Sequence, residues 1–270
     1  MGSLHQDASR GRTPLTDRIS ILMYHQVGEF APMRAHRANY CDHRRFAAQM
    51  AFLSRFGFRV LDLDLALACL RRERATPARA VVLTFDDAYA GFIEYALPIL
   101  LRYRFPATVY AISGWLGKRA EWFAKDPGRP IPDLMSAAQL REIRRAGISV
   151  GSHTVNHANL AQVEQPIQHK ELVESKRTLE DILGEEVRHL CYPSGSFDMS
   201  AVRAARDSGY MTATTCLRGA ATPEDHPLVL PRKAISFGDN LLGYFWKLAV
   251  KHAPKPALAD WRRRMAAGPI

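Results

Sequence analysis

The sequence predicts an α/β fold built around a parallel sheet, and three observations support this. Short apolar runs alternate with segments of helical periodicity along most of the 270-residue chain, which is typical of parallel strands joined by helices. One run, Ala80–Phe85, ends in the adjacent carboxylates Asp86 and Asp87, and another leads into His153 and His157. Because parallel strands carry functional groups at their carboxyl ends, we expect both pairs at one end of the sheet.

The strands are predicted from short apolar runs, and the helices from apolar residues that recur every three or four positions. Phe46, Met50, Leu53 and Phe56 show the helical spacing before Gly57, which ends the first helix. The predicted strands cover residues 19–24, 58–61, 80–85, 107–112 and 148–150. The later helices are expected over residues 62–74, 92–103, 136–146 and 165–183.

The composition is that of one globular domain. A chain of 270 residues that is 47% hydrophobic can build one sizeable core, and no apolar run approaches the roughly 20 residues that cross a bilayer. Residues 1–18 are polar, are expected to be disordered and lack the apolar centre of a secretion signal, which predicts a cytoplasmic protein. The four cysteines show no close pairing or zinc spacing, so we expect reduced, mostly buried thiols.

The net charge of +10 predicts an anionic neighbour, such as a membrane surface, a phosphorylated lipid or nucleic acid. No nucleic-acid motif accompanies the charge, so no nucleic acid is expected as a partner. Residues 239–270 combine an apolar, aromatic stretch around Phe245 and Trp246 with the basic run of residues 262–264. This pattern suits a helix that lies on an anionic membrane, and equally a terminal helix that packs onto the main domain of residues 19–238.

The acid and histidine pairs together have the composition of a catalytic metal centre. Histidines four positions apart share one face of a helical turn, so both can reach one ion. One carboxylate and two imidazoles leave coordination positions for water, and the second carboxylate is then free to act as a base. Alone, an Asp-Asp pair is often a turn or helix cap, and a His-x-x-x-His pair is often accidental. Their joint occurrence favours a hydrolase.

These segments resemble the motifs of the polysaccharide deacetylase family (the NodB-homology domain, carbohydrate esterase family 4). Thr-Phe-Asp-Asp-Ala at residues 84–88 resembles the first motif, Thr-Phe-Asp-Asp-Gly, and residues 152–157 are similar to the second, His-Ser/Thr-x-x-His. Residues 191–195 lie where the third motif, Arg-x-Pro-Tyr, is expected. Residues 21–27 resemble the N-terminal segment of the branch that includes poly-N-acetylglucosamine deacetylases. The resemblance, over about residues 19–236, implies a metal-dependent N-deacetylase on a distorted (β/α) barrel.

The resemblance also implies a role for individual residues. Asp86 is expected to be the general base, and Asp87, His153 and His157 the ligands of a divalent metal, with Zn²⁺ the expected ion. The family's late Leu-x-His motif, which supplies the general acid, is missing from this sequence. His25 is expected to face the metal site and to take that role; the alternative is a core histidine bonded to backbone.

Two positions of the third motif depart from the family pattern. Cys191 stands where the family has the Arg that supports the catalytic Asp, and a thiol carries no fixed positive charge. Ser194 replaces the Tyr whose backbone amide is implied as an oxyanion donor, and a backbone N–H survives that change. Arg232, on a later strand, either supplies the missing charge or is a surface residue.

Aromatic residues near the motifs are candidate substrate contacts. Tyr89 follows the paired acids, and Tyr192 lies within the third motif beside Ser194. Trp115 belongs to the irregular segment of residues 113–133, whose length indicates a functional or mobile loop. With Trp122 and Phe123 it forms either a platform for a sugar ring or part of the core.

The sequence therefore predicts a metal-dependent hydrolase that removes an N-acetyl group from an amino sugar of the N-acetylglucosamine type. The expected substrate is a glycan or a polyprenyl-phosphate-linked saccharide of envelope polysaccharide assembly, handled in the cytoplasm or peripherally at the inner membrane. Two alternatives remain open. One is a catalytically impaired glycan-binding protein on the same scaffold, and the other is a hydrolase of non-sugar amides.

Overall fold

The computed structural model describes residues 17–33, 35–125 and 129–266. In this part of the chain, seven parallel strands close into a barrel, and the pairing of β1 with β5 completes the ring. In order round the barrel, these strands are β1 (Ile19–Tyr24), β10 (Leu230–Ala234), β9 (Thr212–Arg218), β8 (His189–Cys191), β7 (Ser149–Ser152), β6 (Thr108–Ala111) and β5 (Ala80–Phe85). The predicted distorted (β/α) barrel is confirmed.

The distortion lies where β5 meets its neighbours. On one side β5 pairs with β1 over its full length, from Ile19 opposite Ala80 to Tyr24 opposite Phe85. The other side is shared, because β4 (Arg59–Leu61) pairs with the first half of β5 and β6 pairs with its last two residues. All six side chains of β5 are buried, which explains the continuous apolar run that predicted this strand.

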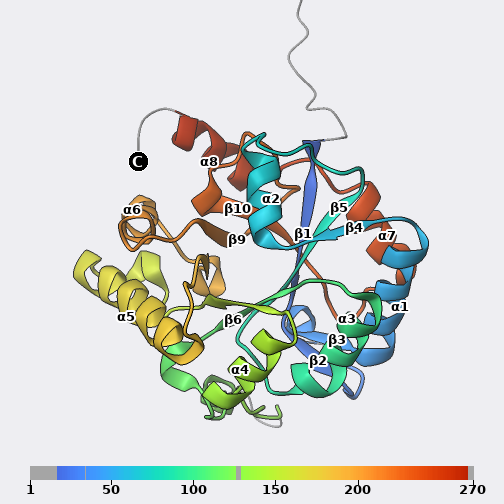
Figure 1. Cartoon of the computed structure of the whole chain (residues 1–270), viewed down its shortest axis with the longest axis horizontal. Coiled ribbons are helices and arrows are strands. Elements are labelled where there is room, and N and C mark those ends of the chain that lie inside the picture. The colour runs from blue at the N-terminus through green and yellow to red at the C-terminus, as the bar shows by residue number, and fades with distance from the viewer. Residues whose placement is uncertain (1–16, 34, 126–128, 267–270) are drawn as a thin grey trace, which may run out of the picture.

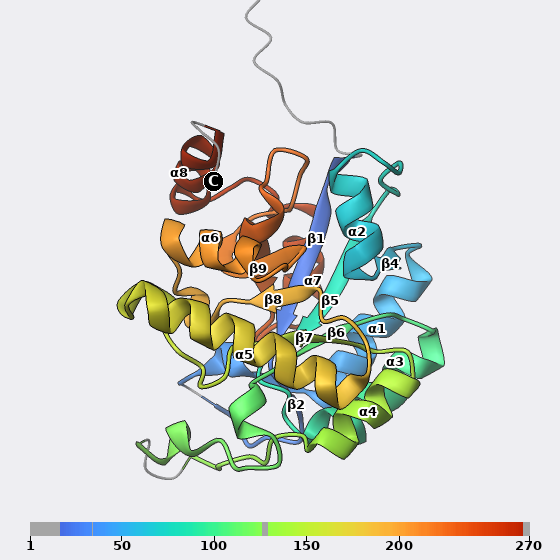
Figure 2. The ribbon, with the colours of Figure 1, turned by 60° about the vertical axis from the view of Figure 1, so that its left-hand side comes forward.

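Helices surround the barrel, as Figures 1 and 2 show. They are α1 (His43–Arg55), α2 (Leu63–Leu70), α3 (Leu97–Tyr103), α4 (Ala137–Arg145), α5 (Gln165–Leu183), α6 (Met199–Asp207), α7 (Leu241–Ala249) and α8 (Pro256–Ala266). A two-stranded parallel sheet, β2 (Gln26–Gly28) with β3 (Tyr40–Asp42), lies beside the barrel. The main core joins barrel side chains to the inner faces of the helices.

The local sequence explains most helix boundaries. Asp42 accepts the N–H groups of Arg44 and Arg45 and so caps α1, whose Phe46, Met50 and Leu53 are buried. Ser136 and Gln139 form a capping box at the start of α4, and α5 ends at Gly184 with φ 70°. Phe56 was predicted on the apolar face of the first helix, but it follows α1 and is 47% exposed.

Two predicted helices differ from the structure. The helix expected over residues 62–74 ends at Leu70, because the chain turns at Arg72, where φ is 62°. The segment 92–103 begins as a π-helical turn, Phe92–Ala96, before α3. Pro98 near the start of α3 has no N–H to donate to the preceding turn, which accounts for the change of helical register there.

The described parts of the segment 113–133, residues 113–125 and 129–133, are largely irregular, as expected, and include the short 3₁₀ turns Ser113–Trp115 and Glu121–Lys125. Figure 2 shows this green segment extending from the barrel below α5. Its Ala120 and Phe123 form a small cluster of their own with Tyr89 and with Leu134, which follows the segment. Its place beside Tyr89, two residues after Asp87, brings the segment to the edge of the candidate site.

Candidate active site

The loops that follow β5, β7 and β8 carry the candidate residues. Asp87, His157 and Ser194 are non-glycine residues in the left-handed region, with φ of 72°, 57° and 56°. Such backbone costs free energy and persists only where its surroundings hold it, and it often occurs at functional sites. The parallel barrel brings these loops together because they all leave from the carboxyl ends of its strands.

Asp87, His153 and His157 form one compact cluster. Asp87 Oδ1 lies 3.3 Å from His153 Nε2 and 3.5 Å from His157 Nε2. This oxygen is buried and has no hydrogen-bond partner among the described residues, whereas Tyr89 donates its hydroxyl to Asp87 Oδ2 at 2.7 Å. The three ligand atoms lie within 4.8 Å of one another, as a shared metal ion requires.

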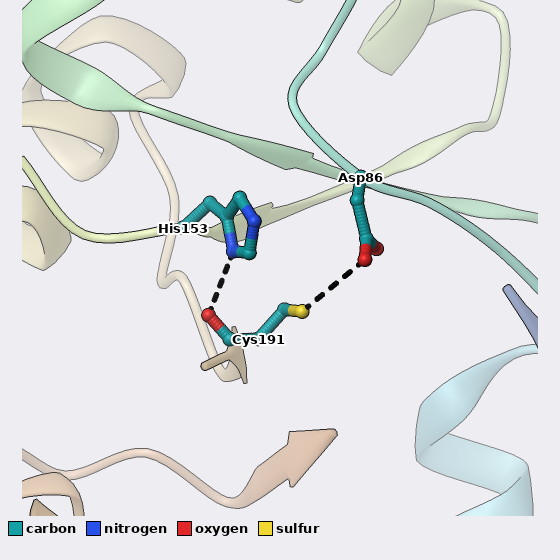
Figure 3. Close-up of side chains that lie close together, drawn as sticks. All are labelled: Asp86, His153 and Cys191. Atoms are coloured by element: carbon teal, nitrogen blue, oxygen red, sulfur yellow. Dashed lines mark hydrogen bonds between the residues drawn. The ribbon is translucent and has the colours of Figure 1, made fainter. Parts of the chain in front are cut away.

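The second ring nitrogen of His153 fixes what this cluster can bind. His153 Nδ1 lies 2.8 Å from the carbonyl oxygen of Cys191 (Figure 3), and a carbonyl only accepts, so Nδ1 carries a proton. In the neutral ring Nε2 is then an acceptor that faces the acceptor Asp87 Oδ1. A shared cation, either a proton or a metal ion, removes this repulsion. A backbone partner of this kind is typical of histidines that bind metals.

The electrostatics of the cluster agree with a cation site. Burial lowers the pKa of His157 to about 4, so its imidazole is neutral and available as a ligand. Burial alone would lower the pKa of His153, but the neighbouring Cys191 and the negative charge of Asp87 outweigh it and raise that pKa. Burial would raise the pKa of Asp87, yet the two histidines hold it below its usual range. Asp87 is therefore ionised.

Asp86, His153 and Cys191 form a second group of potential ligands (Figure 3), but a guanidinium already neutralises it. Arg232 donates from Nη1 to Asp86 Oδ1 at 2.6 Å and from Nη2 to Asp86 Oδ2 at 2.8 Å. Its Nη2 also donates to Cys191 Sγ at 3.0 Å. An Arg is always charged, so a second cation on these atoms would be repelled. The Asp87 cluster is the better metal site.

Arg232 is a buried residue of the barrel interior, so the alternative of a surface Arg is excluded. It is 1% exposed, and besides Asp86 it donates to the Thr215 carbonyl at 2.9 Å and to Thr84 Oγ1 at 3.1 Å. Burial would raise the pKa of Asp86, but the Arg232 charge and hydrogen bonds outweigh it and lower that pKa. A guanidinium thus reaches Asp86 from β10 although Cys191 stands at the third-motif position.

His25 follows β1 directly and lies beside Asp86. Its Nε2 is 3.9 Å from Asp86 Oδ2, and its side chain is 16% exposed. The other ring nitrogen, Nδ1, is buried without a hydrogen-bond partner among the described residues, so the bond to backbone of the alternative interpretation is not observed. The structure therefore brings a partly accessible imidazole, the Asp86 carboxylate and the Asp87 cluster into one site.

The two histidines do not lie on a helix, which corrects the helical-turn prediction. Residues 153–157 form an irregular loop, and Glu171 of α5 holds it. Glu171 Oε2 accepts the backbone N–H groups of Val155 and Asn156 at 2.9 and 2.8 Å, and Oε1 accepts the Asn156 side chain at 2.7 Å. Glu171 was missed in the sequence, although an acidic residue on the apolar face of a predicted helix was the available signal.

Two predicted substrate contacts are wrong, because both side chains are buried. Tyr192 is 0% exposed, donates its hydroxyl to the Leu228 carbonyl at 3.1 Å and stacks on Phe197, so it belongs to the core. Tyr89 is 3% exposed and bonds Asp87. Tyr89 is therefore a residue that positions Asp87 rather than a sugar contact.

The other two predicted substrate residues stay accessible. Ser194 is exposed on a short 3₁₀ turn, and Trp115 is partly buried. Trp115 packs edge-on against Trp122, which in turn stacks on the His157 ring at 5.6 Å with an interplanar angle of 10°. Trp122 is thus the tryptophan in contact with a cluster residue, which sequence spacing did not reveal.

The chain is similar to a known family and to curated proteins. A family model described as polysaccharide deacetylase matches residues 73–213, just over half of the chain. The protein YxkH of Bacillus subtilis is 26% identical over 227 residues, which cover 84% of this chain and 75% of that protein. The poly-β-1,6-N-acetyl-D-glucosamine N-deacetylase of Staphylococcus epidermidis is 24% identical over 244 residues, or 87% of this chain and 78% of that protein.

Solved structures share the barrel. The Streptococcus pyogenes deacetylase PplD, in complex with acetate, matches with a TM-score of 0.75 and 25% identity, over 86% of this chain and 98% of that one. IcaB from Ammonifex degensii matches with a TM-score of 0.74 and 22% identity over the same shares, a likeness of fold. Among the residues that the structure describes, no helix is long and apolar enough to cross a membrane.

Proposed function

The chain belongs to the polysaccharide deacetylase family, and we propose that it is a metal-dependent N-deacetylase of an N-acetylglucosamine-type sugar. The main observation behind the proposal is that the adjacent carboxylates Asp86 and Asp87 have different partners. Asp87 faces two imidazoles, whereas Asp86 faces a buried guanidinium. This division separates a ligand from a base, as hydrolysis of an unactivated amide requires.

We propose that Asp87, His153 and His157 hold a divalent metal, with Zn²⁺ the ion suggested by the donor set. When bound, such an ion lowers the pKa of water and polarises an amide carbonyl. Asp86 takes a proton from the attacking water, and Arg232 keeps that carboxylate ionised and oriented. His25 Nε2, beside Asp86, gives a proton to the departing amine. The backbone N–H of Ser194 is the proposed donor to the developing oxyanion.

Arg232 also weakens the case for a catalytically impaired glycan-binding protein. That alternative depended on the loss of the third-motif Arg at Cys191 and of the late His. Because Arg232 contacts both Asp86 oxygens and Cys191 Sγ, the charge is present from another strand. His25 stands in reach as the acid. Both losses thus have a candidate replacement within the same site.

Regarding the substrate, we propose an N-acetylglucosamine-containing glycan or a polyprenyl-phosphate-linked saccharide of envelope polysaccharide assembly. The name of the Staphylococcus epidermidis relative, a poly-β-1,6-N-acetyl-D-glucosamine N-deacetylase, supports the sugar class. Trp122 and Trp115, next to His157, suit the flat face of a pyranose ring. We further propose a cytoplasmic enzyme that lies peripherally on the inner membrane through exposed residues of α7.

Amine release from β-1,6- and β-1,4-linked N-acetylglucosamine oligomers tests this function. The purified chain should release free amines, a chelator should abolish the release, and added Zn²⁺ should restore it. His157→Ala is the negative control. It removes one proposed ligand and should therefore reduce both the bound metal and the turnover. A metal-loaded protein that leaves both oligomers intact but hydrolyses simple N-acetyl amides would instead favour the non-sugar alternative.

A further inference from the structure

A cavity of about 490 Å³ lies outside the barrel, between the ends of β9 and β10, the end of α7 and the connection to α8. Its described lining contains no acidic residue. Six of its lining residues are basic: Arg218, Arg232, Lys233, Lys247, Lys251 and Lys255. Like charges gathered around one small volume repel one another, so this arrangement is unfavourable unless an anion enters.

Two of the six basic residues are balanced by acids, and Arg232 is one of them, through its ion pair with Asp86. Lys247 pairs with Asp239, and its Nζ also donates to the Ala234 carbonyl at 2.7 Å. Arg218, Lys251 and Lys255 make no ion pair with any carboxylate of the described residues. These three side chains are exposed and can turn toward the cavity. The cavity therefore has a surplus of free positive charge.

Lys233 forms the inner wall and is the strongest sign of a built site. It is 6% exposed, and its Nζ donates to Ser20 Oγ at 2.9 Å and to the Lys247 carbonyl at 2.7 Å. Its third contact is His252 Nδ1 at 3.3 Å. All three acceptors are neutral, so the ammonium is buried without a counter-ion, which is costly. Burial, with the nearby Arg18 charge, lowers the pKa of Lys233 to about 7.

The cavity shares Arg232 with the candidate active site, but the guanidinium of Arg232 is bonded to Asp86 there. Arg232 and Lys233 are neighbours on β10, and successive side chains of a strand point to opposite faces. Arg232 reaches Asp86 inside the barrel, whereas Lys233 reaches the backbone of α7 on the outside. The deacetylation chemistry proposed above does not use this outer face.

We propose that this cavity binds a phosphate group, as a phosphate monoester or a diphosphate. A phosphate carries up to two negative charges on closely spaced oxygens, which suits an Arg fork and two flexible lysines converging on one volume. The bound anion would also supply the counter-ion that Lys233 lacks. The phosphate is either free in solution or the headgroup of a lipid. The inference does not depend on the proposed deacetylase activity.

Calorimetric titration of the full chain with inorganic phosphate and with pyrophosphate, at constant ionic strength, tests the proposal. Saturable binding of one equivalent is expected. Two variants should each weaken phosphate binding by about tenfold or more, because charge-assisted hydrogen bonds are lost. They are the double variant Lys251→Ala/Lys255→Ala and the single variant Arg218→Ala. The matched control is Lys170→Ala/Arg177→Ala on α5, which removes the same charge from exposed positions and should bind as the unchanged protein does.

Vesicles distinguish the two sources of the phosphate. If a lipid headgroup is the ligand, vesicles with phosphatidic acid should bind the chain more tightly than phosphatidylcholine vesicles, and Lys251→Ala/Lys255→Ala should remove the difference. If the ligand is soluble, phosphate and pyrophosphate bind but that vesicle difference is absent or equal in both proteins. Absence of saturable binding to every probe, or equal weakening by the α5 control, would overturn the proposal.

Discussion

At the scale of single residues, Asp86 and Asp87 are adjacent in the chain but have different partners. Asp87 is held by Tyr89 and faces the two histidines, while Asp86 receives two hydrogen bonds from Arg232. The backbone at Asp87 is left-handed, with a φ of 72°. Two carboxylates that are adjacent in the sequence therefore lie in different chemical environments.

We predict that Asp86→Asn keeps the bound metal and the fold but lowers turnover by about 10²–10⁴-fold, since an amide cannot accept the proton. Asp87→Asn should lose the metal, because a neutral amide is a weaker ligand than a carboxylate. Elemental analysis and amine release, measured on both variants and the unchanged protein, check this. The reverse pattern, metal lost in the first variant and kept in the second, would exchange the two roles.

His25→Ala is expected to lower kcat by about 10²–10⁴-fold with little change in metal content, because a proton donor to the departing amine is removed. His25 contacts Asp86 rather than the Asp87 cluster, which is why metal binding should survive. The exposed His169 of α5, changed to Ala, serves as the control and should turn over normally. Near-normal kcat in the His25 variant would assign the acid to another group.

At the scale of elements, α7 shows that the two interpretations of the C-terminal tail describe two faces of one helix. Tyr244 and Leu248 are 0% and 3% exposed and pack into the core, so they are not available to a membrane. Leu242 and Trp246 are 78% and 52% exposed on the other face. Of the apolar, aromatic stretch that the sequence offered for a membrane contact, only the exposed face of α7 is therefore accessible.

The exposed face of α7 gives a testable form of the membrane proposal. Leu242→Ser/Trp246→Ser should reduce flotation with anionic vesicles at low salt, because the apolar contact with the acyl boundary is lost. Leu101→Ser/Ile167→Ser removes two similarly exposed apolar residues elsewhere and should float as the unchanged chain does. Thermal unfolding of both variants checks that the fold is retained. Equal flotation of all three proteins would leave α7 without a membrane role.

At the scale of the whole molecule, closure of the barrel buries titratable groups that the unfolded chain exposes. His189 on β8 is 5% exposed, and its Nδ1 lies 2.9 Å from Thr212 Oγ1 of β9. Burial, and then the charge of Arg188, lower the pKa of His189 to about 4 despite the acidic side chains of α2 nearby. At mildly acidic pH, His189 therefore stays neutral in the folded protein and is protonated in the unfolded chain.

The sign of the resulting pH dependence follows from that difference. Between about pH 6.5 and 4 the unfolded state binds the proton and the folded state does not, so the free energy of unfolding should fall as pH falls. At pH 5 the loss from His189 is about 2 kcal/mol relative to pH 7. Urea unfolding at both pH values should show a smaller loss in His189→Asn than in the unchanged chain or in His169→Asn. An equal loss in all three would contradict the assignment.

Local pattern alone determined much of this protein. The bounds of β1, β5 and α5 follow from continuous apolar runs or from helical periodicity, and the cap at Ser136 and the stop at Gly184 are local signals. The strands after α5 were not predicted individually, because β8 has only three residues and β9 is rich in Thr. The acids and histidines were found because each pair lies directly after a predicted strand.

Only the tertiary structure decided which side chains meet. Arg232 reaches Asp86 across 146 positions of sequence, and Glu171 fixes the histidine loop from a separate helix. Tyr192 faces the core and Tyr89 faces Asp87, although both lie within motif segments. A sequence pattern reports the periodicity of one element, whereas these contacts depend on barrel closure, which brings strands distant in the chain together. The residue types at the ends of strands can therefore be predicted from the local sequence, but the side chains that they contact cannot.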